Sequence, residues 1–599
     1  MLRSSPRPAF IWLLFCVLAF VAGPLRGQED AAPLTATETR ENGKLAVTVG
    51  GVDGPVRDNV LALLELNRFA DQTAPEETRL RWLHGRAETQ IREALQPFGY
   101  YEPTIESTLN RIPNGWEARY QIQPGRVLRI AMLDVRILGE GRQDPAFQQA
   151  LANVPLAQGQ VLDQPKYEQF KQALETLATE RGYFDARFTE RVIEVNLQAY
   201  EAAIRLHYDT GPRYRFGAIT FEQDFLSSKL LNRYPHFKPG DPYNSNDLLK
   251  LQGDLNSSPY FSQIQVNAPP DAATDAVPVN VELEPNKKHK YSAGAGYGTD
   301  TGARVKLKAE QRWLNRRGHH AEEELLWSPI KAFLGGKYYI PGEDPTTDAY
   351  TLTAGYSQQN YNQQDYEQYL IGGGWQQQDG KWLKNYNLSY QYEDFSVGNQ
   401  PRTSALLLIP SLNWTWIDAD DRLYPTRGLL FGLGLRGAST ALLSDLDFVQ
   451  GTLQLKGVYA LNDASRIIAR ADAGATVISQ GFENLPTSLR FFTGGDASVR
   501  GYAYNSIGPT DDEGTVIGGK NLLVGSVEYE HRVWDGWSLA AFVDSGDAFD
   551  GATPEMKTGV GFGLRWRSPV GPVRLDFASG LDRPPGDVFR FSFSIGPDL

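Results

Sequence analysis

The chain has 599 residues, which is long enough for several domains. Its 59 Lys and Arg residues are outnumbered by 72 Asp and Glu residues, and this acidic balance argues against a nucleic-acid partner. With one cysteine in the whole sequence, a fold held together by disulfides is excluded as well.

The N-terminus has the pattern of a secretory signal peptide. Arg3 and Arg7 precede an apolar run over residues 9–22, and small residues follow the run. The run is too short for a transmembrane helix, and no later stretch supplies about 18 consecutive apolar residues. The single cysteine, Cys16, lies inside it. We therefore predict that residues 1–27 are a signal peptide, and an exported chain of this size without disulfides suits the bacterial envelope.

Residues 44–286 repeat one pattern three times: a short apolar strand, helical segments and two closing strands. Each main helix ends at a glycine or proline followed by a tyrosine, as in Gly99-Tyr100, Gly182-Tyr183 and Pro259-Tyr260. Glycine ends a helix at low cost, and the aromatic side chains pack back onto the sheet. The pattern resembles the POTRA domain, a binding module, and a set of generic α+β domains is the alternative. The predicted units are 28–125, which includes an N-terminal segment, then 126–213 and 214–286.

From residue 289 onward, apolar and polar residues alternate and no helical period is present. Val560, Phe562 and Leu564 share one parity, for example, while glycines fill the positions between them. Apolar residues outside and polar or small residues inside are typical of a transmembrane β-barrel. We predict that residues 287–599 form an all-β, antiparallel barrel of sixteen strands, after three α+β modules. The predicted strands are 290–298, 303–313, 319–327, 333–340, 348–358, 366–378, 382–394, 405–417, 428–437, 447–461, 466–478, 521–533, 537–547, 557–567, 571–580 and 588–596.

One interval of the barrel, residues 479–520, is too rich in glycine and polar residues to be a strand. Loops of about forty residues are usually functional or disordered. This one contains Val499-Arg500-Gly501-Tyr502, and strand alternation places Glu528 and Asp544 on the luminal face of the twelfth and thirteenth strands. We predict that the arginine enters the lumen and forms charge-assisted bonds with both carboxylates. An ordinary surface loop is the alternative.

These motifs together resemble the outer-membrane assembly superfamily that includes BamA, TamA and the two-partner secretion transporters. The family has a Val-Arg-Gly-Tyr sixth loop, an aspartate strand and a conserved periplasmic turn. Three modules, rather than two or five, favour the TamA branch. The resemblance implies a loop-to-lumen anchor of Val499, Arg500, Gly501, Tyr502, Glu528, Asp544 and Gly546, and a turn motif of Asp421, Arg422, Pro425 and Gly428.

The resemblance also implies a function. It predicts an assembly factor in the bacterial outer membrane, with its modules in the periplasm, that inserts or secretes β-barrel and autotransporter substrates without ATP. The implied partners are unfolded substrate proteins, outer-membrane lipid and an inner-membrane-anchored protein of the TamB type. Two alternatives stay open: a two-partner-type secretion pore that threads an exoprotein through the lumen, and a passive porin anchored by its modules. A passive channel has no need of three binding modules, which argues against the porin.

In the family's mechanism the first and last barrel strands pair weakly and open sideways, so that exposed edges template an incoming strand. Gly294 and Gly296 of the first predicted strand offer little packing and weaken it. The last predicted strand contains Phe591 and Phe593 and ends at Gly596, followed by a proline that lacks a ladder donor. We predict that these five residues form a lateral seam.

The sequence shows no pairing of a nucleophile with a base, so we predict that the protein is not an enzyme and needs no cofactor. The run His319-His320-Ala321-Glu322-Glu323-Glu324 looks metal-like, but adjacent residues of a strand face opposite ways, and we predict no metal site. The basic run Lys287-Lys288-His289-Lys290 is either a solvated linker or a contact with anionic lipid headgroups.

Overall fold

The computed structural model describes residues 43–421, 424–568, 571–583 and 589–595. The predicted signal peptide lies outside these residues, as do Arg422 of the turn motif and Gly596 of the seam. Among the described residues, no helix is both long and apolar enough to cross a membrane. The chain divides into two compact units, one with the residues up to Leu133, Pro155–Glu168 and Val192–Ile204, the other with Asp134–Val154, Gln169–Arg191 and the residues from Arg205 onward.

Three three-stranded sheets precede the barrel, with strand orders β1-β3-β2, β4-β6-β5 and β7-β9-β8. In the first and third sheets the first strand runs parallel to the central strand and the second runs antiparallel to it. The elements are β1 (Lys44–Gly50), α1 (Gly54–Leu63), α2 (Glu77–Leu95), β2 (Thr104–Ile112), β3 (Gly115–Gln123), β4 (Arg129–Leu138), α3 (Pro145–Ala152), α4 (Gln164–Arg181), β5 (Arg187–Asn196), β6 (Glu201–Asp209), β7 (Arg215–Glu222), α5 (Ser228–Leu231), α6 (Ser245–Ser257), β8 (Phe261–Asn267) and β9 (Ala276–Pro285).

The sequence explains why these helices form and where they end. Helix α2 buries Leu80, Leu83 and Ile91, which recur at the helical period and face the core of the first sheet. After α2 and a short 3-10 turn, Gly99 adopts φ +82°, and Gly182 adopts φ +83° directly after α4. Both glycines take the left-handed conformation that commonly ends a helix, which is the pattern that the sequence predicts.

The third sheet and the barrel turn between β11 and β12 share one hydrophobic core. Trp313, from the turn after β11, packs against the core of the third sheet, and its ring lies 5.0 Å from that of Phe225. The hydroxyl of Tyr260 donates to the carbonyl of Gly318 in the same turn at 2.6 Å. Gly318 has φ +77°, and a Cβ atom there would lie 2.5 Å from a methyl of Leu230. The turn therefore needs glycine at this position for two reasons, backbone conformation and space.

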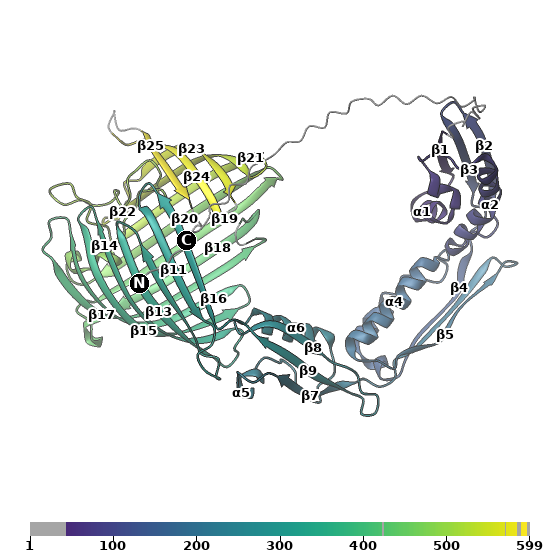
Figure 1. Cartoon of the computed structure of the whole chain (residues 1–599), viewed down its shortest axis with the longest axis horizontal. Helices are drawn as coiled ribbons and strands as arrows, with labels where there is room; N and C mark the ends of the chain where they lie inside the picture. The colour runs from purple at the N-terminus through teal and green to yellow at the C-terminus, as the bar shows by residue number, and fades with distance from the viewer. Residues whose placement is uncertain (1–42, 422–423, 569–570, 584–588, 596–599) are drawn as a thin grey trace, which may run out of the picture. The chain divides into compact units, whose positions relative to one another are not determined.

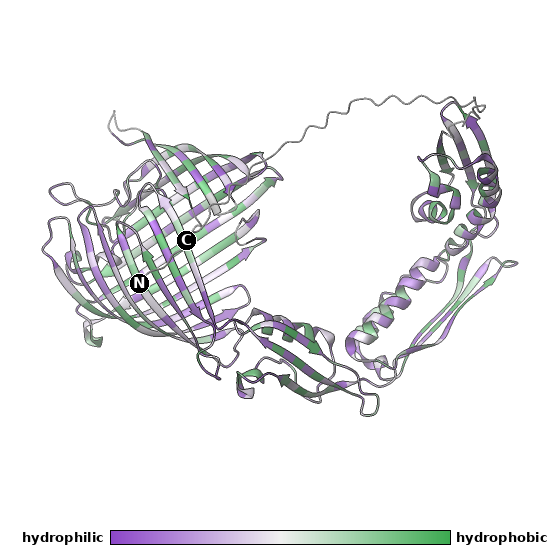
Figure 2. Cartoon of the chain, in the orientation of Figure 1, coloured by the Kyte–Doolittle hydropathy of each residue, from purple (hydrophilic) through white to green (hydrophobic). Residues whose placement is uncertain are grey.

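Sixteen antiparallel strands close into a barrel in which β10 neighbours β25 (Figure 1). Hydrophobic and hydrophilic residues alternate along many of these strands (Figure 2), as strands with one apolar face require. Every predicted strand is present, with ends that differ by at most three residues. The strands are β10 (His289–Gly298), β11 (Gly302–Gln311), β12 (His320–Trp327), β13 (Lys331–Pro341), β14 (Asp348–Tyr361), β15 (Gln364–Asp379), β16 (Trp382–Val397), β17 (Thr403–Ala419), β18 (Arg427–Ala438), β19 (Phe448–Asn462), β20 (Ser465–Ile478), β21 (Asn521–Trp534), β22 (Trp537–Phe549), β23 (Lys557–Ser568), β24 (Gly571–Gly580) and β25 (Phe589–Ile595).

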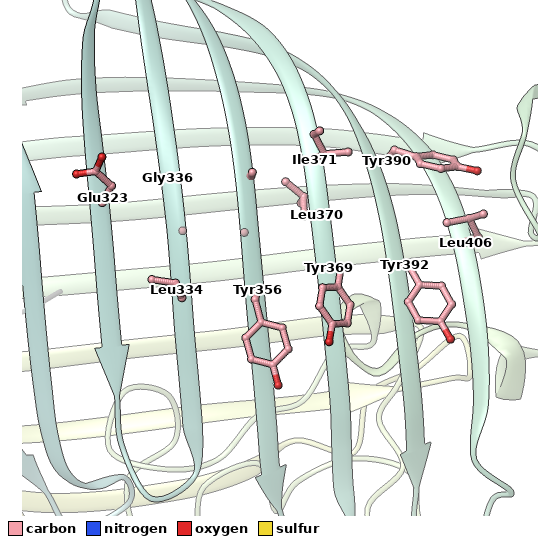
Figure 3. A pocket seen from close by; sticks show the side chains of 13 residues that line it. Glu323, Leu334, Gly336, Tyr356, Tyr369, Leu370, Ile371, Tyr390, Tyr392 and Leu406 are labelled. Carbon is pink, nitrogen blue, oxygen red and sulfur yellow. The ribbon is translucent and has the colours of Figure 1, made fainter. Parts of the chain in front are cut away.

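The outer wall of the barrel carries a row of tyrosines. Tyr356, Tyr369 and Tyr392 stand opposite one another on β14, β15 and β16, and Figure 3 shows them side by side. Next to this row, Gly336 and Ala354 leave a shallow depression of about 670 Å³. Aromatic rows of this kind are typical of the surface that a barrel presents to the edge of a lipid bilayer.

Candidate functional site

Arg500, in the long loop between β20 and β21 that we call loop 6 (residues 479–520), contacts both predicted carboxylates. Its Nε and Nη2 atoms donate to the two oxygens of Asp544 at 2.7 and 2.9 Å, and its Nη1 donates to Glu528 at 2.5 Å. Its guanidinium carbon also lies 3.4 Å from the ring centre of Phe542. Arg500 is 9% exposed and Asp544 is fully buried, so the two-pronged ion pair forms away from bulk water.

The register of β21 and β22 explains how one arginine reaches two strands. Ser526 stands opposite Asp544, and Glu528 stands opposite Phe542. The two carboxylates are therefore diagonal neighbours on the luminal face, with the aromatic ring beside Glu528. The Ser526 hydroxyl donates to Asp544 at 2.6 Å and fixes the carboxylate that Arg500 grips.

Glycines on the luminal wall make room for the backbone of loop 6. A Cβ atom at Gly559 would lie 1.8 Å from the carbonyl oxygen of Arg500, and one at Gly546 would lie 3.0 Å from a methyl of Val499. Gly501 itself has φ +94°, and a Cβ there would lie 2.8 Å from the backbone of Gly580. Only glycine meets all three conditions, because the loop backbone lies directly on the strand backbones.

Tyr502 anchors the far end of the same stretch. It is buried, and its hydroxyl donates to the Asp582 carboxylate at 3.2 Å, just after β24. Val499 and Tyr502 also belong to a small apolar cluster with Ile507 and Val524. Val499, Arg500, Gly501 and Tyr502 thus all contact the barrel, and an ordinary surface loop does not describe them.

Two luminal residues that the sequence did not single out extend the ion-pair network. Arg565 on β23 donates to Glu528 at 3.0 Å and to Asp576 on β24 at 2.6 Å. Asp576 also lies 3.8 Å from Arg500. Two arginines therefore share three carboxylates, which are Glu528, Asp544 and Asp576. Strand parity carried a signal, because Arg565 shares the parity of the luminal glycines of β23 and so lies on the same face.

A second anchor holds an earlier part of loop 6 and was also missed. Glu393 on β16 is fully buried and accepts a hydrogen bond from the backbone N–H of Ser488 at 3.0 Å. Arg490 donates to the carbonyls of Leu485 and Ile517, at 2.8 and 3.1 Å, and so ties two parts of the loop together. No periodicity could reveal these partners, since they depend on how the loop folds back.

The turn between β17 and β18 lies at the opposite end of the barrel from loop 6. Asp420 organises it by accepting from the backbone N–H groups of Asp421 and Thr426, at 2.9 and 3.0 Å. The Thr426 hydroxyl and these backbone donors lower the pKa of Asp420 to about 2. Asp421 accepts in turn from the backbone N–H of Tyr424 at 2.9 Å.

The same turn reaches into the barrel end through Tyr424. Its hydroxyl donates to Glu530 at 3.2 Å, and the guanidinium of Arg466 lies 3.6 Å from its ring centre. Arg466 also donates to the carbonyl of Pro425 at 2.8 Å. At the start of β18, a Cβ at Gly428 would approach that of Ala419 to 3.0 Å, which favours glycine.

The predicted seam is the closure between β10 and β25, and Gly596 of that prediction lies outside the described residues. Within the described residues the ladder has two pairs, Tyr297 with Ile595 and Gly298 with Ser594. On its other side, β10 pairs with β11 over all ten of its residues. The backbone of Phe593 exchanges hydrogen bonds with Thr299, at 3.1 and 3.2 Å, which adds one contact beyond the ladder.

The other predicted seam residues contribute little to this closure. A Cβ at Gly296 would lie 2.7 Å from the carbonyl of Ile595, so this glycine permits a close approach of the two strands. Gly294 lies apart from β25, near Lys306 of β11. The ring of Phe591 faces outward and lies 5.3 Å from that of Phe577 on β24. Within the described residues, the ladder across the seam has two pairs, and Gly296 lets the two backbones approach closely.

The fold is a closed sixteen-stranded barrel that follows α/β modules and holds an arginine-bearing loop in its lumen. Residues 337–598 match the Omp85 superfamily domain, and residues 46–124 match POTRA domain TamA domain 1. The barrel is thus an Omp85 superfamily domain, and the first module is a TamA-type POTRA domain.

Curated relatives and a solved structure agree with this assignment. The outer membrane protein assembly factor BamA of Nitratidesulfovibrio vulgaris is 26% identical over 393 residues, 60% of this chain and 48% of the relative. That of Neisseria meningitidis serogroup B is 23% identical over 428 residues, 59% of this chain and 53% of the relative. The chain thus spans about half the length of the curated relatives it matches. The structure of BamA from Haemophilus ducreyi lacking POTRA domains 1–3 shares the fold, with TM-score 0.65 and 18% identity over 78% of this chain and 99% of that one.

Proposed function

We propose that this protein is an assembly factor of the TamA branch of the superfamily, which inserts β-barrel and autotransporter substrates into the bacterial outer membrane. The observation that carries the proposal is the seam between β10 and β25, where Gly296 brings the two backbones close together and, within the described residues, two residue pairs join the strands. A seam strand that carries glycines offers little side-chain packing to its neighbour and opens at low cost, and an open edge can template an incoming strand.

The modules support the TamA branch. The first matches a TamA-type POTRA model, and the two sheets that follow repeat its strand order. We assign all three as POTRA modules that lie in the periplasm and bind unfolded substrate proteins. On this assignment the barrel end with the Asp420 turn faces the periplasm, because the chain enters β10 at that end.

The proposed partners follow from this placement. Unfolded outer-membrane or autotransporter proteins would pair with the edge of β10, and outer-membrane lipid surrounds the barrel. An inner-membrane-anchored protein of the TamB type would reach the modules across the periplasm. The proposed mechanism is strand exchange, which breaks no covalent bond, so it needs neither an enzymatic centre nor ATP.

A reversible lock on the seam tests the function. We expect that Tyr297→Cys with Ile595→Cys, which replaces two directly opposite residues, forms a disulfide that joins β10 to β25. Because the only native cysteine is Cys16, no other thiol of the mature chain competes. The oxidised protein in lipid vesicles should fail to insert an autotransporter barrel, and reduction should restore insertion.

The matched control is Val527→Cys with Val543→Cys, an opposite pair on β21 and β22 within the continuous wall. Its disulfide should leave insertion unchanged, since those strands are not expected to separate. If the oxidised seam pair inserted substrate at the wild-type rate, insertion would not require the seam to open and the proposal would be wrong.

A further inference from the structure

Loop 6 is tied to the seam by a second set of contacts, separate from the Arg500 anchor. The turn between β10 and β11 contains Thr299 and Asp300, at the barrel end where loop 6 begins and ends. The Thr299 hydroxyl donates to the Asp496 carboxylate at 2.9 Å, and the Asp496 backbone N–H donates to Asp300 at 2.6 Å. Loop 6 is thereby bonded to the first hairpin of the barrel.

The same hairpin turn is bonded to the last strand. Arg590 on β25 donates to the other oxygen of Asp300 at 2.8 Å, and the Asp300 side chain is 5% exposed. Asp300 therefore joins two segments that are not its sequence neighbours, loop 6 through one oxygen and β25 through the other. Thr299 does likewise, since it contacts both Asp496 and Phe593.

We infer that Thr299, Asp300, Asp496 and Arg590 form a clasp that holds the outer end of the seam shut. The inference rests on the proposed opening of the seam and names the residues that regulate it. Within the described residues the ladder between β10 and β25 has two residue pairs, and the clasp adds an ion pair and two hydrogen bonds across three segments. Release of the clasp should therefore precede separation of the strands.

The clasp brings two carboxylates together with one cation. Burial, with Asp300 as the next cause, raises the pKa of Asp496 to about 6. The groups that face it are Asp300, Thr299 and Ser592, with Arg590 as the compensating charge. Tyr504 approaches from loop 6 itself, and Arg304 of β11 lines the same luminal cavity.

The sign of the pH effect follows from that shift. Protonation of Asp496 removes its repulsion with Asp300, so the closed clasp gains stability as the pH falls through about 6. If the open state has an ordinary aspartate pKa of about 4, opening should be about tenfold rarer at pH 5 than at pH 7.5. The seam is thus expected to open more readily at neutral pH.

The test measures hydrogen-exchange protection factors of the amides in β10 and β25, with the full protein in lipid nanodiscs. Arg590→Gln removes the compensating cation and one charged hydrogen bond, and should lower seam protection about tenfold or more. Asp496→Asn keeps an acceptor for Thr299 but removes the charge beside Asp300. It should raise protection at pH 7.5 and abolish the difference between pH 5 and pH 7.5.

Opposite responses to the two variants separate the clasp from general destabilisation, which would lower protection in both. Arg304→Gln is the matched control, because it removes a positive charge from the same cavity but is not one of the four clasp residues, and it should leave seam protection unchanged. The clasp is refuted if Arg590→Gln leaves seam protection within about twofold of wild type. A normal clasp response in a protein that never inserts substrate would instead refute the proposed function alone.

Discussion

Asp544 accepts four hydrogen bonds, three of them from Arg500 and one from Ser526. A buried ion pair adds little net stability, because desolvation offsets its attraction. Loss of one partner, however, leaves the other as an unpaired buried charge. The value of Arg500 is therefore positional: it determines where loop 6 lies against β21 and β22. Loss of the arginine alone should therefore destabilise the loop more than loss of the whole ion pair.

We expect Arg500→Ala to cost about 3–5 kcal/mol in the seating of loop 6, since Asp544 keeps its charge without a cationic partner while Glu528 retains only Arg565. Adding Asp544→Asn to Arg500→Ala should recover part of that loss, because it removes the unpaired buried charge. Protease cleavage within loop 6 measures seating, while heat-modifiable gel mobility reports that the barrel stays folded. Equal cleavage of the single and double variants would show that the unpaired Asp544 charge does not cause the loss of loop seating.

At the scale of the element, β23 meets loop 6 with a luminal face that is rich in glycine. Gly559, Gly561 and Gly563 alternate on its luminal face, and Gly559 lies directly beneath the carbonyl of Arg500. At Gly559 the strand gives up side-chain packing so that the backbone of loop 6 can approach. A methyl group at that point tests whether the close approach holds the loop in place.

We expect Gly559→Ala to displace loop 6, because its Cβ would lie 1.8 Å from the Arg500 carbonyl oxygen. Overpacking of this kind costs about 1–3 kcal/mol, and loop 6 should become sensitive to protease. Gly525→Ala on β21 is the control, since a Cβ there meets nothing within 4 Å. If both variants resist protease equally, contact with β23 does not hold the loop.

At the scale of the whole molecule, the third module and the barrel are joined through the turn after β11. We expect Gly318→Ala to loosen this joint, through strain at φ +77° and a clash with Leu230, by about 1–3 kcal/mol. Gly240→Ala in the same module has φ +93° and open space, so it isolates the backbone strain from the clash. Faster proteolysis between β9 and β10 in the first variant only is the expected result; equal rates would mean that the turn does not hold the module.

The barrel strands could be predicted from the sequence, because the alternation of apolar and polar residues is a local signal that each strand carries. Sequence reasoning also paired Arg500 with Glu528 and Asp544, since the loop motif and strand parity are both readable. It missed Asp496, because that contact requires loop 6 to cross to a turn nearly two hundred residues earlier. It missed α3 for a different reason: Asp144 caps that helix just before Pro145, a local start signal that was overlooked.

The anchoring of loop 6 also constrains how the protein itself is made. Val499 to Tyr502 rest on β21, β22, β23 and the segment after β24, all of which follow the loop in the chain. The loop is synthesised before the strands that it contacts, so these contacts form only after the later strands have been made. The clasp needs β25 as well, which is the last strand of all. We therefore expect loop 6 to take its final position only after β21 to β24 have formed, and a chain truncated before β21 would lack every barrel contact described here for Val499 to Tyr502.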